Sequence, residues 1–286
     1  MPSDGDTRAL GRSGIRVLPL GIGTNKWRGA DRAAVGETCR TVTAAGPCMI
    51  DTAEVYRSER VVGDCLGADP GRAIIATKFA PFPGRTSPRR LMRGLDASLA
   101  RLGVRTIDLY YVHFPLPWVD VRVFGDGLIE AVKSGRARAV GVANFSADQM
   151  RRIADHLGKA GVPLAANQVN YSLLKRKPES NGVLDACREL DVALVAYFPL
   201  ASGRLTQQSD GNRTRALLAL LAEVARAHDA KISQVALNWL VARDPHVIPI
   251  PGATKPHHAK ANLAALGWHL SKAEFDAIDR ASADRR

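Results

Sequence analysis

Residues 73–113 read AIIATKFAPFPGRTSPRRLMRGLDASLARLGVRTIDLYYVH. This stretch opens with an apolar, β-branched run that predicts a strand over Ala73–Lys78, and it closes with a second such run over Ile107–His113. Between them, Ser87–Arg101 repeats apolar residues at helical spacing, with Ser87 placed to cap the helix. A strand, a helix and a second strand of this length predict two neighbouring parallel strands joined by a crossover helix.

The same alternation extends in both directions along the chain. The further predicted strands are Val17–Gly23, Cys48–Asp51, Ala137–Val142, Ala165–Val169, Ala193–Tyr197 and Val247–Pro249. The further predicted helices are Asp31–Ala45, Ser58–Leu66, Val121–Lys133, Ser146–His156, Gly182–Leu190, Arg213–Leu240 with a break near Ala230, His257–Leu266 and Ser271–Ala281. This pattern predicts repeated βα units and therefore an α/β fold.

Eight βα units favour a closed (β/α)8 TIM barrel over an open, doubly wound sheet. Eight strands close such a barrel, and 286 residues are about its usual length. The GxGxxG fingerprint of doubly wound dinucleotide-binding domains is missing, because Gly21-Ile22-Gly23 continues as Thr24-Asn25-Lys26. No linker-like segment divides the chain, so we expect residues 1–286 to form one domain. The segment Arg8–Arg16 is predicted as a small hairpin that closes the barrel floor.

Composition and charge exclude several classes of protein. The formal net charge is +12, but arginine is spread along the whole chain and aromatic residues make up only 6%. Nucleic-acid-binding surfaces concentrate their cations, so we expect no nucleic-acid partner. The longest apolar run, Ala216–Ala222, is too short to cross a bilayer, and the N-terminus lacks the apolar core of a secretory signal. We therefore expect no membrane partner and a cytoplasmic location.

Cysteine and histidine spacing gives no sign of a disulfide scaffold or a metal site. Cys39, Cys48, Cys65 and Cys187 form no CxxC pair, and we expect reduced thiols. The pair His257-His258 has no further histidine or cysteine at ligand spacing, so no metal is expected.

Polar residues follow six successive predicted strands, at the end where barrel enzymes carry their active sites. They are Asp51, Lys78, His113, Asn144, Gln168 and Tyr197. A single strand-ending Asn or Asp is commonly a turn former, but Lys78 and His113 close otherwise apolar runs. The sequence therefore predicts a functional site at this face of the barrel.

The residue types at this face are those of a proton-transfer site. A lysine at the mouth of an apolar barrel needs a carboxylate partner, and Asp51 on the neighbouring strand is available. Tyr56 stands in the loop IDTAEVYRSE, residues 50–59, where an adjacent ammonium lowers the pKa of a phenol. His113 is placed to direct a substrate oxygen or to share the proton relay. The alternative left open is a surface tyrosine beside a plain Asp51–Lys78 ion pair.

Several segments, taken in order, are similar to the aldo-keto reductases, and the match runs from about Leu10 to Ala281. They are IDTAEVYRSE, ATK, SLARLGVRTIDLYYVHFP, GRARAVGVANF, NQVNYSLL, AYFPLASGRL and IPIPGATKPHHAKAN. The resemblance implies an NADPH-dependent oxidoreductase that reduces an aldehyde or ketone to an alcohol. It implies Tyr56 as the general acid, Lys78 as the group that tunes the pKa of Tyr56, Asp51 as the partner of Lys78, and His113 as the carbonyl-orienting residue.

The resemblance also implies how NADP(H) is held. Asn144 and Gln168 would bind the nicotinamide carboxamide, and Tyr197 would stack under the ring. The segment Pro199-Leu200-Ala201-Ser202-Gly203 would wrap the pyrophosphate, with Lys255 at the 2′-phosphate and Asn262 near the adenine. The chain departs from the family's pattern at Arg57, Ala143, Phe198, His258 and Ala261, which bears on cofactor affinity and on the preference for NADPH over NADH.

Two other functions fit the same motifs. One is a non-catalytic, cofactor-binding regulatory subunit of the same fold, and the other is a tailoring reductase of a bulky biosynthetic keto intermediate. Arg57 and the scattered positive charge suit an anionic substrate. No motif specifies the substrate, the physiological direction or an oligomeric state. The expected pocket walls are the loops Asn25–Trp27, Phe79–Phe82, Phe114–Trp118 and Ser202–Gly211.

Overall fold

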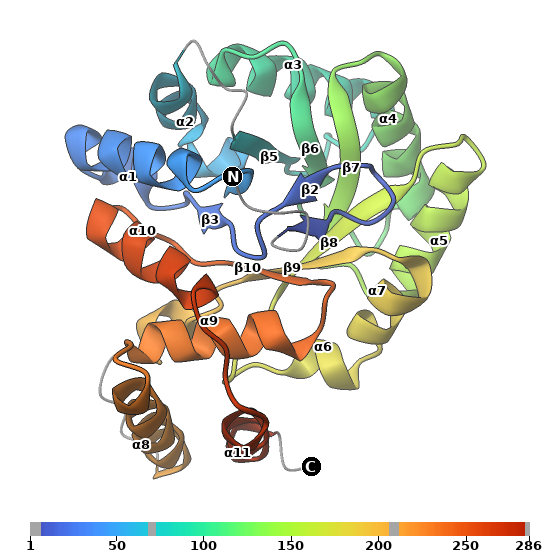
Figure 1. Cartoon of the computed structure of the whole chain (residues 1–286). Coiled ribbons are helices and arrows are strands. Elements are labelled where there is room, and N and C mark those ends of the chain that lie inside the picture. Colours follow the sequence, from blue (N-terminus) through green and yellow to red (C-terminus); the bar gives the residue numbers. More distant parts are fainter. Residues whose placement is uncertain (1–6, 68–72, 206–211, 284–286) are drawn as a thin grey trace.

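The computed structural model describes residues 7–67, 73–205 and 212–283, and it shows a parallel barrel surrounded by helices (Figure 1). Eight strands, β3 to β10, lie in sequence order and pair in parallel. Between the first and last of them, Gly23 forms a parallel bridge to Gly252, and the Gly21 amide donates to the Pro249 carbonyl at 3.0 Å. The predicted (β/α)8 TIM barrel is confirmed.

The elements follow the predicted order. The barrel strands are β3 (Ile22–Gly23), β4 (Cys48–Asp51), β5 (Ala73–Phe79), β6 (Ile107–Val112), β7 (Ala137–Ala143), β8 (Leu164–Asn170), β9 (Ala193–Tyr197) and β10 (Val247–Ile250). The helices are α1 (Arg32–Ala44), α2 (Glu59–Leu66), α3 (Pro88–Leu102), α4 (Val121–Lys133), α5 (Ala147–Gly158), α6 (Lys177–Ser180), α7 (Val183–Leu190), α8 (Asn212–Ala227), α9 (Ile232–Arg243), α10 (Pro256–Leu263) and α11 (Lys272–Ser282). Within the described residues, no helix is both long and apolar enough to span a bilayer.

A short hairpin closes the floor of the barrel, as predicted. Its strands β1 (Arg8–Ala9) and β2 (Arg16–Val17) pair antiparallel, and its apolar residues pack against the side chains that fill the barrel interior. Gly11 allows the close approach of this hairpin. Its φ is +52°, and a Cβ there would lie 2.7 Å from the carbonyl oxygen of Asp191. An L-residue at position 11 would meet both backbone strain and a clash.

One predicted strand is wrong in extent. Val17–Gly23 is not a single strand, because Val17 ends the hairpin and only Ile22–Gly23 joins the barrel. Pro19 lies between the two pieces and has no amide hydrogen for a strand ladder. The amide of Leu18 instead donates to the carbonyl of Pro47.

Helix starts and stops follow the local sequence closely. Ser87, Ser146 and Ser271 each accept a hydrogen bond from the third backbone amide of their helix, and Ser146 and Ser271 complete capping boxes. The predicted break near Ala230 separates α8 from α9, with Asp229 at φ +46°. The single turn α6, which begins with Lys177-Pro178, was not predicted from the sequence.

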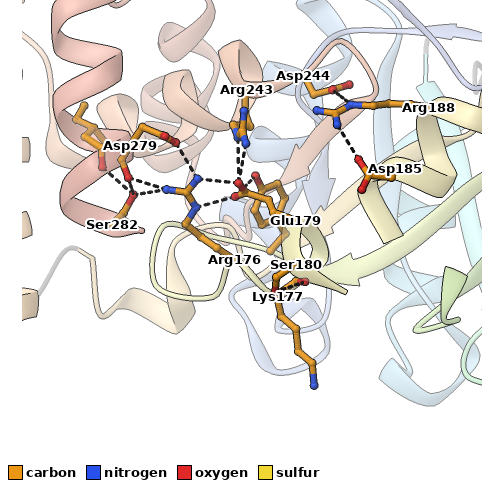
Figure 2. A network of polar contacts seen from close by, with 12 residues as sticks. Arg176, Lys177, Glu179, Ser180, Asp185, Arg188, Arg243, Asp244, Asp279 and Ser282 are labelled. Atoms are coloured by element: carbon orange, nitrogen blue, oxygen red, sulfur yellow. Dashed lines mark hydrogen bonds and ion pairs between the residues drawn. The ribbon is translucent and has the colours of Figure 1, made fainter. Parts of the chain in front are cut away.

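A polar network anchors α6 to α9 and α11 (Figure 2). Glu179 of α6 accepts from Arg176 and from Arg243 at the end of α9, each at 2.7 Å. Arg176 also donates to Asp279 of α11 at 2.7 Å and lies 4.9 Å from the ring centroid of Trp239. Since Arg176 is only 8% exposed, these contacts satisfy a charge that burial would otherwise penalise.

Candidate active site

Asp51 and Lys78 form a buried ion pair at the ends of neighbouring strands. Asp51 is in register with Ala76, so Lys78, two residues further along β5, points to the same side, into the barrel. The Lys78 Nζ lies 2.6 Å from Oδ1 of Asp51, with side-chain exposures of 0% and 3%. The sequence-based pairing of these two residues is therefore present in the structure.

Two further hydrogen bonds surround this pair. The Lys78 ammonium donates to the Thr52 carbonyl at 2.7 Å, and Gln168 donates from Nε2 to Oδ2 of Asp51 at 2.7 Å. Burial raises the pKa of Asp51 and lowers that of Lys78, while the contact between them favours both charged forms. A buried pair is more tolerable when its donors and acceptors are hydrogen-bonded, and these contacts serve both carboxylate oxygens and two of the three ammonium N–H groups.

Tyr56 stands beside the ammonium on a tight turn, which we call the tyrosine turn (Glu54–Arg57). A 3-10 turn over Glu54–Tyr56 ends at Arg57, whose φ is +58°. The turn brings the Tyr56 ring centroid to 5.1 Å from the Lys78 Nζ. The same ring meets the ring of His113 edge-on, with centroids 5.6 Å apart. Four segments of the chain thus bring Asp51, Tyr56, Lys78 and His113 together.

The pKa values at this cluster favour neutral tyrosine and neutral histidine. Burial, and then the charge of Asp51, raise the pKa of Tyr56 above its ordinary value. The net direction is opposite to the lowering expected from the sequence, because burial of the phenol disfavours its charged form and the Asp51 carboxylate adds to this effect. Burial, and then the charge of Lys78, lower the pKa of His113 to about 3. Its Nδ1 is buried without a hydrogen-bond partner among the described residues.

These groups line a cavity of about 260 Å³ at the carboxyl ends of the strands. Its polar lining includes Asp51, Tyr56, His113, Asn144, Gln168 and Tyr197. Five of the six predicted strand-end residues therefore line one cavity, and the sixth, Lys78, lies directly behind Asp51. A phenol and an imidazole at one small cavity, with an ammonium buried next to them, suit proton transfer to a bound polar group.

A second hollow of about 500 Å³ continues from the first. Both hollows are lined by Gly23, Asn25, Phe198 and Gly252. Beyond them the second hollow runs along the loop after β9, past Pro199, Leu200, Ser202 and Gly203, to His258 on α10. Positive φ angles at Phe198, Ala201 and Ser202 turn this loop sharply around the hollow. The site therefore has room for a long ligand as well as a small one.

A model of the aldo/keto reductase family matches residues 19–283. The chain belongs to the aldo/keto reductase family. A chloroplastic pyridoxal reductase of Arabidopsis thaliana is 30% identical over 301 residues, which cover 91% of this chain and 82% of the relative. An aldo-keto reductase of Schizosaccharomyces pombe, yakc, whose description includes NADP(+), is 29% identical over 314 residues. The match covers 96% of this chain and 91% of that relative.

Solved structures agree with this assignment. A thermostable aldo-keto reductase, solved with the inhibitor epalrestat, matches with a TM-score of 0.80 at 31% identity, covering 96% of this chain and 99% of that one. Family and named relatives together identify this aldo/keto reductase as an oxidoreductase.

The two predicted residues after β10, Lys255 and Asn262, line neither hollow, although His258 of the same helix lines the second. Lys255 is exposed at the N-terminus of α10, three residues before His258, and its side chain does not cap the helix. Asn262, on the same helix, is 6% exposed. Among the departures from the family's pattern, Ala143 is buried next to Asn144 and Phe198 is 44% exposed at the junction of the hollows. Part of the expected loop Ser202–Gly211, residues 206–211, lies outside the described residues.

The residues that support the tyrosine turn were not predicted from the sequence. The hydroxyl of Ser58 lies 2.9 Å from that of Thr52 and 3.1 Å from that of Thr24, all three buried. Glu54 accepts from the Ala80 amide at 2.6 Å and from both terminal nitrogens of Arg85. The signal was the cluster of short polar residues that flanks the tyrosine in IDTAEVYRSE. These contacts hold the turn against β4 and β5.

Proposed function

We propose that this aldo/keto reductase reduces an aldehyde or ketone to an alcohol with NADPH, and that Tyr56 supplies the proton. The observation that carries the proposal is the meeting of Tyr56, His113 and the Asp51–Lys78 pair at one cavity. The cofactor, when bound, supplies hydride to the carbonyl carbon.

Tyr56 suits the part of general acid because its environment keeps it protonated. Its raised pKa leaves the phenol neutral near pH 7, so a proton is available for the oxygen of the bound carbonyl. When that proton leaves, negative charge appears on a ring whose centroid is 5.1 Å from the Lys78 ammonium. The ammonium stabilises the phenolate, while Asp51 holds the ammonium in place.

His113 acts in this proposal as a neutral hydrogen-bond donor. With a pKa of about 3 its ring carries a single N–H at neutral pH. A neutral imidazole facing the cavity orients a carbonyl oxygen toward Tyr56 without competing with it as an acid. The edge-on contact between the two rings keeps His113 in this orientation.

The residues around the two hollows fit a nicotinamide dinucleotide. The Asn144 amide donates to the His113 carbonyl and accepts from the Tyr197 hydroxyl, which leaves one N–H and one lone pair for a carboxamide. The looped segment from Pro199 to Gly203 lines the second hollow and suits a pyrophosphate. At the far end, α10 begins without a side-chain cap or an acidic first turn beside Lys255, which suits a phosphate group.

Steady-state oxidation of NADPH, driven by a panel of aldehydes and ketones, tests the proposal. Tyr56→Phe is expected to lower kcat by about 10²–10⁴-fold while NADPH affinity stays within twofold of the wild type. Tyr110→Phe is the matched control, since Tyr110 is buried in the wall between barrel and helices and lines neither hollow. Near-normal turnover in Tyr56→Phe would remove Tyr56 from the mechanism.

The same assay separates the alternatives. A cofactor-binding regulatory subunit would bind NADPH without turning over any carbonyl, whereas a tailoring reductase would turn over only bulky keto substrates. A small-molecule partner, one domain over residues 1–286 and a cytoplasmic location stay predictions. The plant relative is described as chloroplastic.

A further inference from the structure

A groove lined by arginines lies on the outer side of the tyrosine turn. It has a volume of about 590 Å³ and lies between the turn, the start of α2, the loop before α3 and the end of α3. Four guanidinium groups line it, from Arg57, Arg60, Arg85 and Arg101. The groove shares no lining residue with either hollow of the active site.

Two carboxylates in the groove are already neutralised. Glu54 pairs with Arg85, with N–O distances of 3.0 and 3.1 Å. Glu59, fully buried, accepts from Arg101 at 2.5 Å and from Thr77 at 2.7 Å. Each of these arginines uses two of its five N–H donors in hydrogen bonds to protein partners, so donors remain on both.

The other two arginines have no such partners. Arg57 and Arg60 are exposed and make no ion pair within the part of the chain that the structure describes. Arg57 is held at a φ of +58° by the end of the turn, so its backbone direction is fixed. Four arginines against two glutamates leave two uncompensated positive charges in one groove.

The first turn of α2 begins at the same place, and it carries the carboxylate of Glu59. Ser58 precedes this helix, but its hydroxyl is used by Thr24 and Thr52 and does not cap the helix. The first amides of a helix that lacks such a cap point outward with a partial positive charge. In α2 the first two residues, Glu59 and Arg60, both line the groove.

We propose that this groove binds a phosphate-type dianion at a site separate from the active site. Guanidinium groups from three segments can surround a tetrahedral ligand such as phosphate. A single carboxylate suits this groove less well, because one arginine already binds both of its oxygens. A charge of −2 also matches the two uncompensated positive charges. The ligand is either free phosphate or the phosphate end of a larger anion, and the separation of the groove from the cavity favours the free ion.

Thermal unfolding in sodium phosphate at constant ionic strength tests binding without any assumption about the proposed function. At ten times Kd, phosphate is expected to raise the Tm of the wild type by about 2–3 °C, and the rise continues with the logarithm of the phosphate concentration. The double variant Arg57→Gln/Arg60→Gln should lose most of this rise and weaken Kd at least tenfold. Circular dichroism in buffer without phosphate checks that the variant folds as the wild type does.

Two single variants locate the site. Arg93→Gln removes one exposed charge from α3 outside the groove, and it should keep the full phosphate response. Lys255→Ala removes the cation beside α10 and should also keep it. An absent response in the wild type, a response that rises linearly rather than logarithmically with phosphate concentration, an unchanged response in the double variant, or its loss in Lys255→Ala would each overturn the proposal.

Steady-state kinetic measurements, which rest on the proposed function, identify the source of the anion. If the groove binds free phosphate, phosphate changes the kcat or KM for an uncharged aldehyde, and Arg60→Gln removes that change without altering turnover in its absence. If the groove binds the substrate's own phosphate, phosphate raises KM only for a phosphorylated aldehyde. Each result supports the site and identifies its ligand. The thermal unfolding experiment tests binding even if the protein reduces no carbonyl.

Discussion

The Lys78 ammonium lies 5.1 Å from the centre of the Tyr56 ring and 2.6 Å from the Asp51 carboxylate. One lysine is thus shared between a buried carboxylate that requires a cation and a phenol that benefits from one. Asp51 and Lys78 come from adjacent strands, whereas Tyr56 comes from a loop. The position of the tyrosine turn therefore determines how strongly the lysine acts on the phenol.

Lys78→Met is expected to lower kcat by at least 100-fold, because the phenolate loses its cationic neighbour. Any residual activity should show a higher apparent pKa for the proton donor in its pH–rate profile. The single variant also leaves Asp51 buried without a counter-ion, so the double variant Asp51→Asn/Lys78→Met separates catalysis from folding. Recovery of activity in the double variant would show that Lys78 only neutralises Asp51.

His113 is expected to stay neutral over the whole physiological range. Since its pKa is lowered to about 3, its ring resonances should not titrate between pH 5 and 8 in histidine-labelled NMR spectra. The folded state then binds fewer protons than the unfolded state between about pH 3 and 6.5. His113 therefore contributes stability that is present above pH 6.5 and lost as the pH falls toward 3. His113→Gln should remove this part of the pH dependence of the free energy of unfolding. A ring that titrates near pH 6.5 contradicts the assignment.

The barrel was predictable because its signals are local and repeated. Cys48–Asp51 and Ala193–Tyr197 coincide with β4 and β9, since each is an apolar run bounded by turn residues. Val17–Gly23 was overextended, because the apolar pattern continues through Pro19 while the backbone pairing does not. The single turn α6 was missed because four residues carry no periodicity.

The candidate site was predictable in its membership but not in its electrostatics. The strand ends bring Asp51, Gln168 and Tyr197 to one cavity independently of the loop conformations, because parallel strands end at one face of the barrel. The direction of the pKa shift at Tyr56 depends on its burial and on its distance from Asp51, and spacing along the chain specifies neither. The support from Ser58, Thr52 and Thr24 depends on how the tyrosine turn folds back.

Gly11→Ala is expected to destabilise the protein by about 2–4 kcal/mol, because its Cβ would meet the Asp191 carbonyl at 2.7 Å and its φ is +52°. Gly14→Ala in the same hairpin is the matched control. Its φ is +75° but nothing lies within 4 Å of the added Cβ, so only the backbone penalty of about 1 kcal/mol applies. Urea unfolding of both variants gives the comparison. Equal losses would show that the hairpin shifts freely on the barrel floor.

Lys255→Ala is expected to reduce the preference for NADPH over NADH. Lys255 stands at the start of α10 beside His258, where, in the proposed function, its cation would meet the 2′-phosphate that only NADPH carries. A charge-assisted contact of this kind gives about tenfold to a hundredfold in affinity. His258 adds little, because burial and the neighbouring His257 lower its pKa and favour its neutral form. NADPH binding should therefore weaken by that factor, and NADH binding should barely change.

Quenching of tryptophan fluorescence measures both affinities, since the Trp27 indole donates to the carbonyl of Ala253, which lines the second hollow. Lys260→Ala is the control, because Lys260 is also exposed on the same helix but lies five residues beyond Lys255, away from the N-terminus of α10. This variant removes the same charge from the surface, so it measures how much of the change in NADPH affinity comes from long-range electrostatics. Salt screens this long-range contribution. A selective loss of NADPH affinity in Lys255→Ala alone locates the phosphate at the start of α10. Equal affinities for NADPH and NADH in the wild type would show that Lys255 does not contact the phosphate.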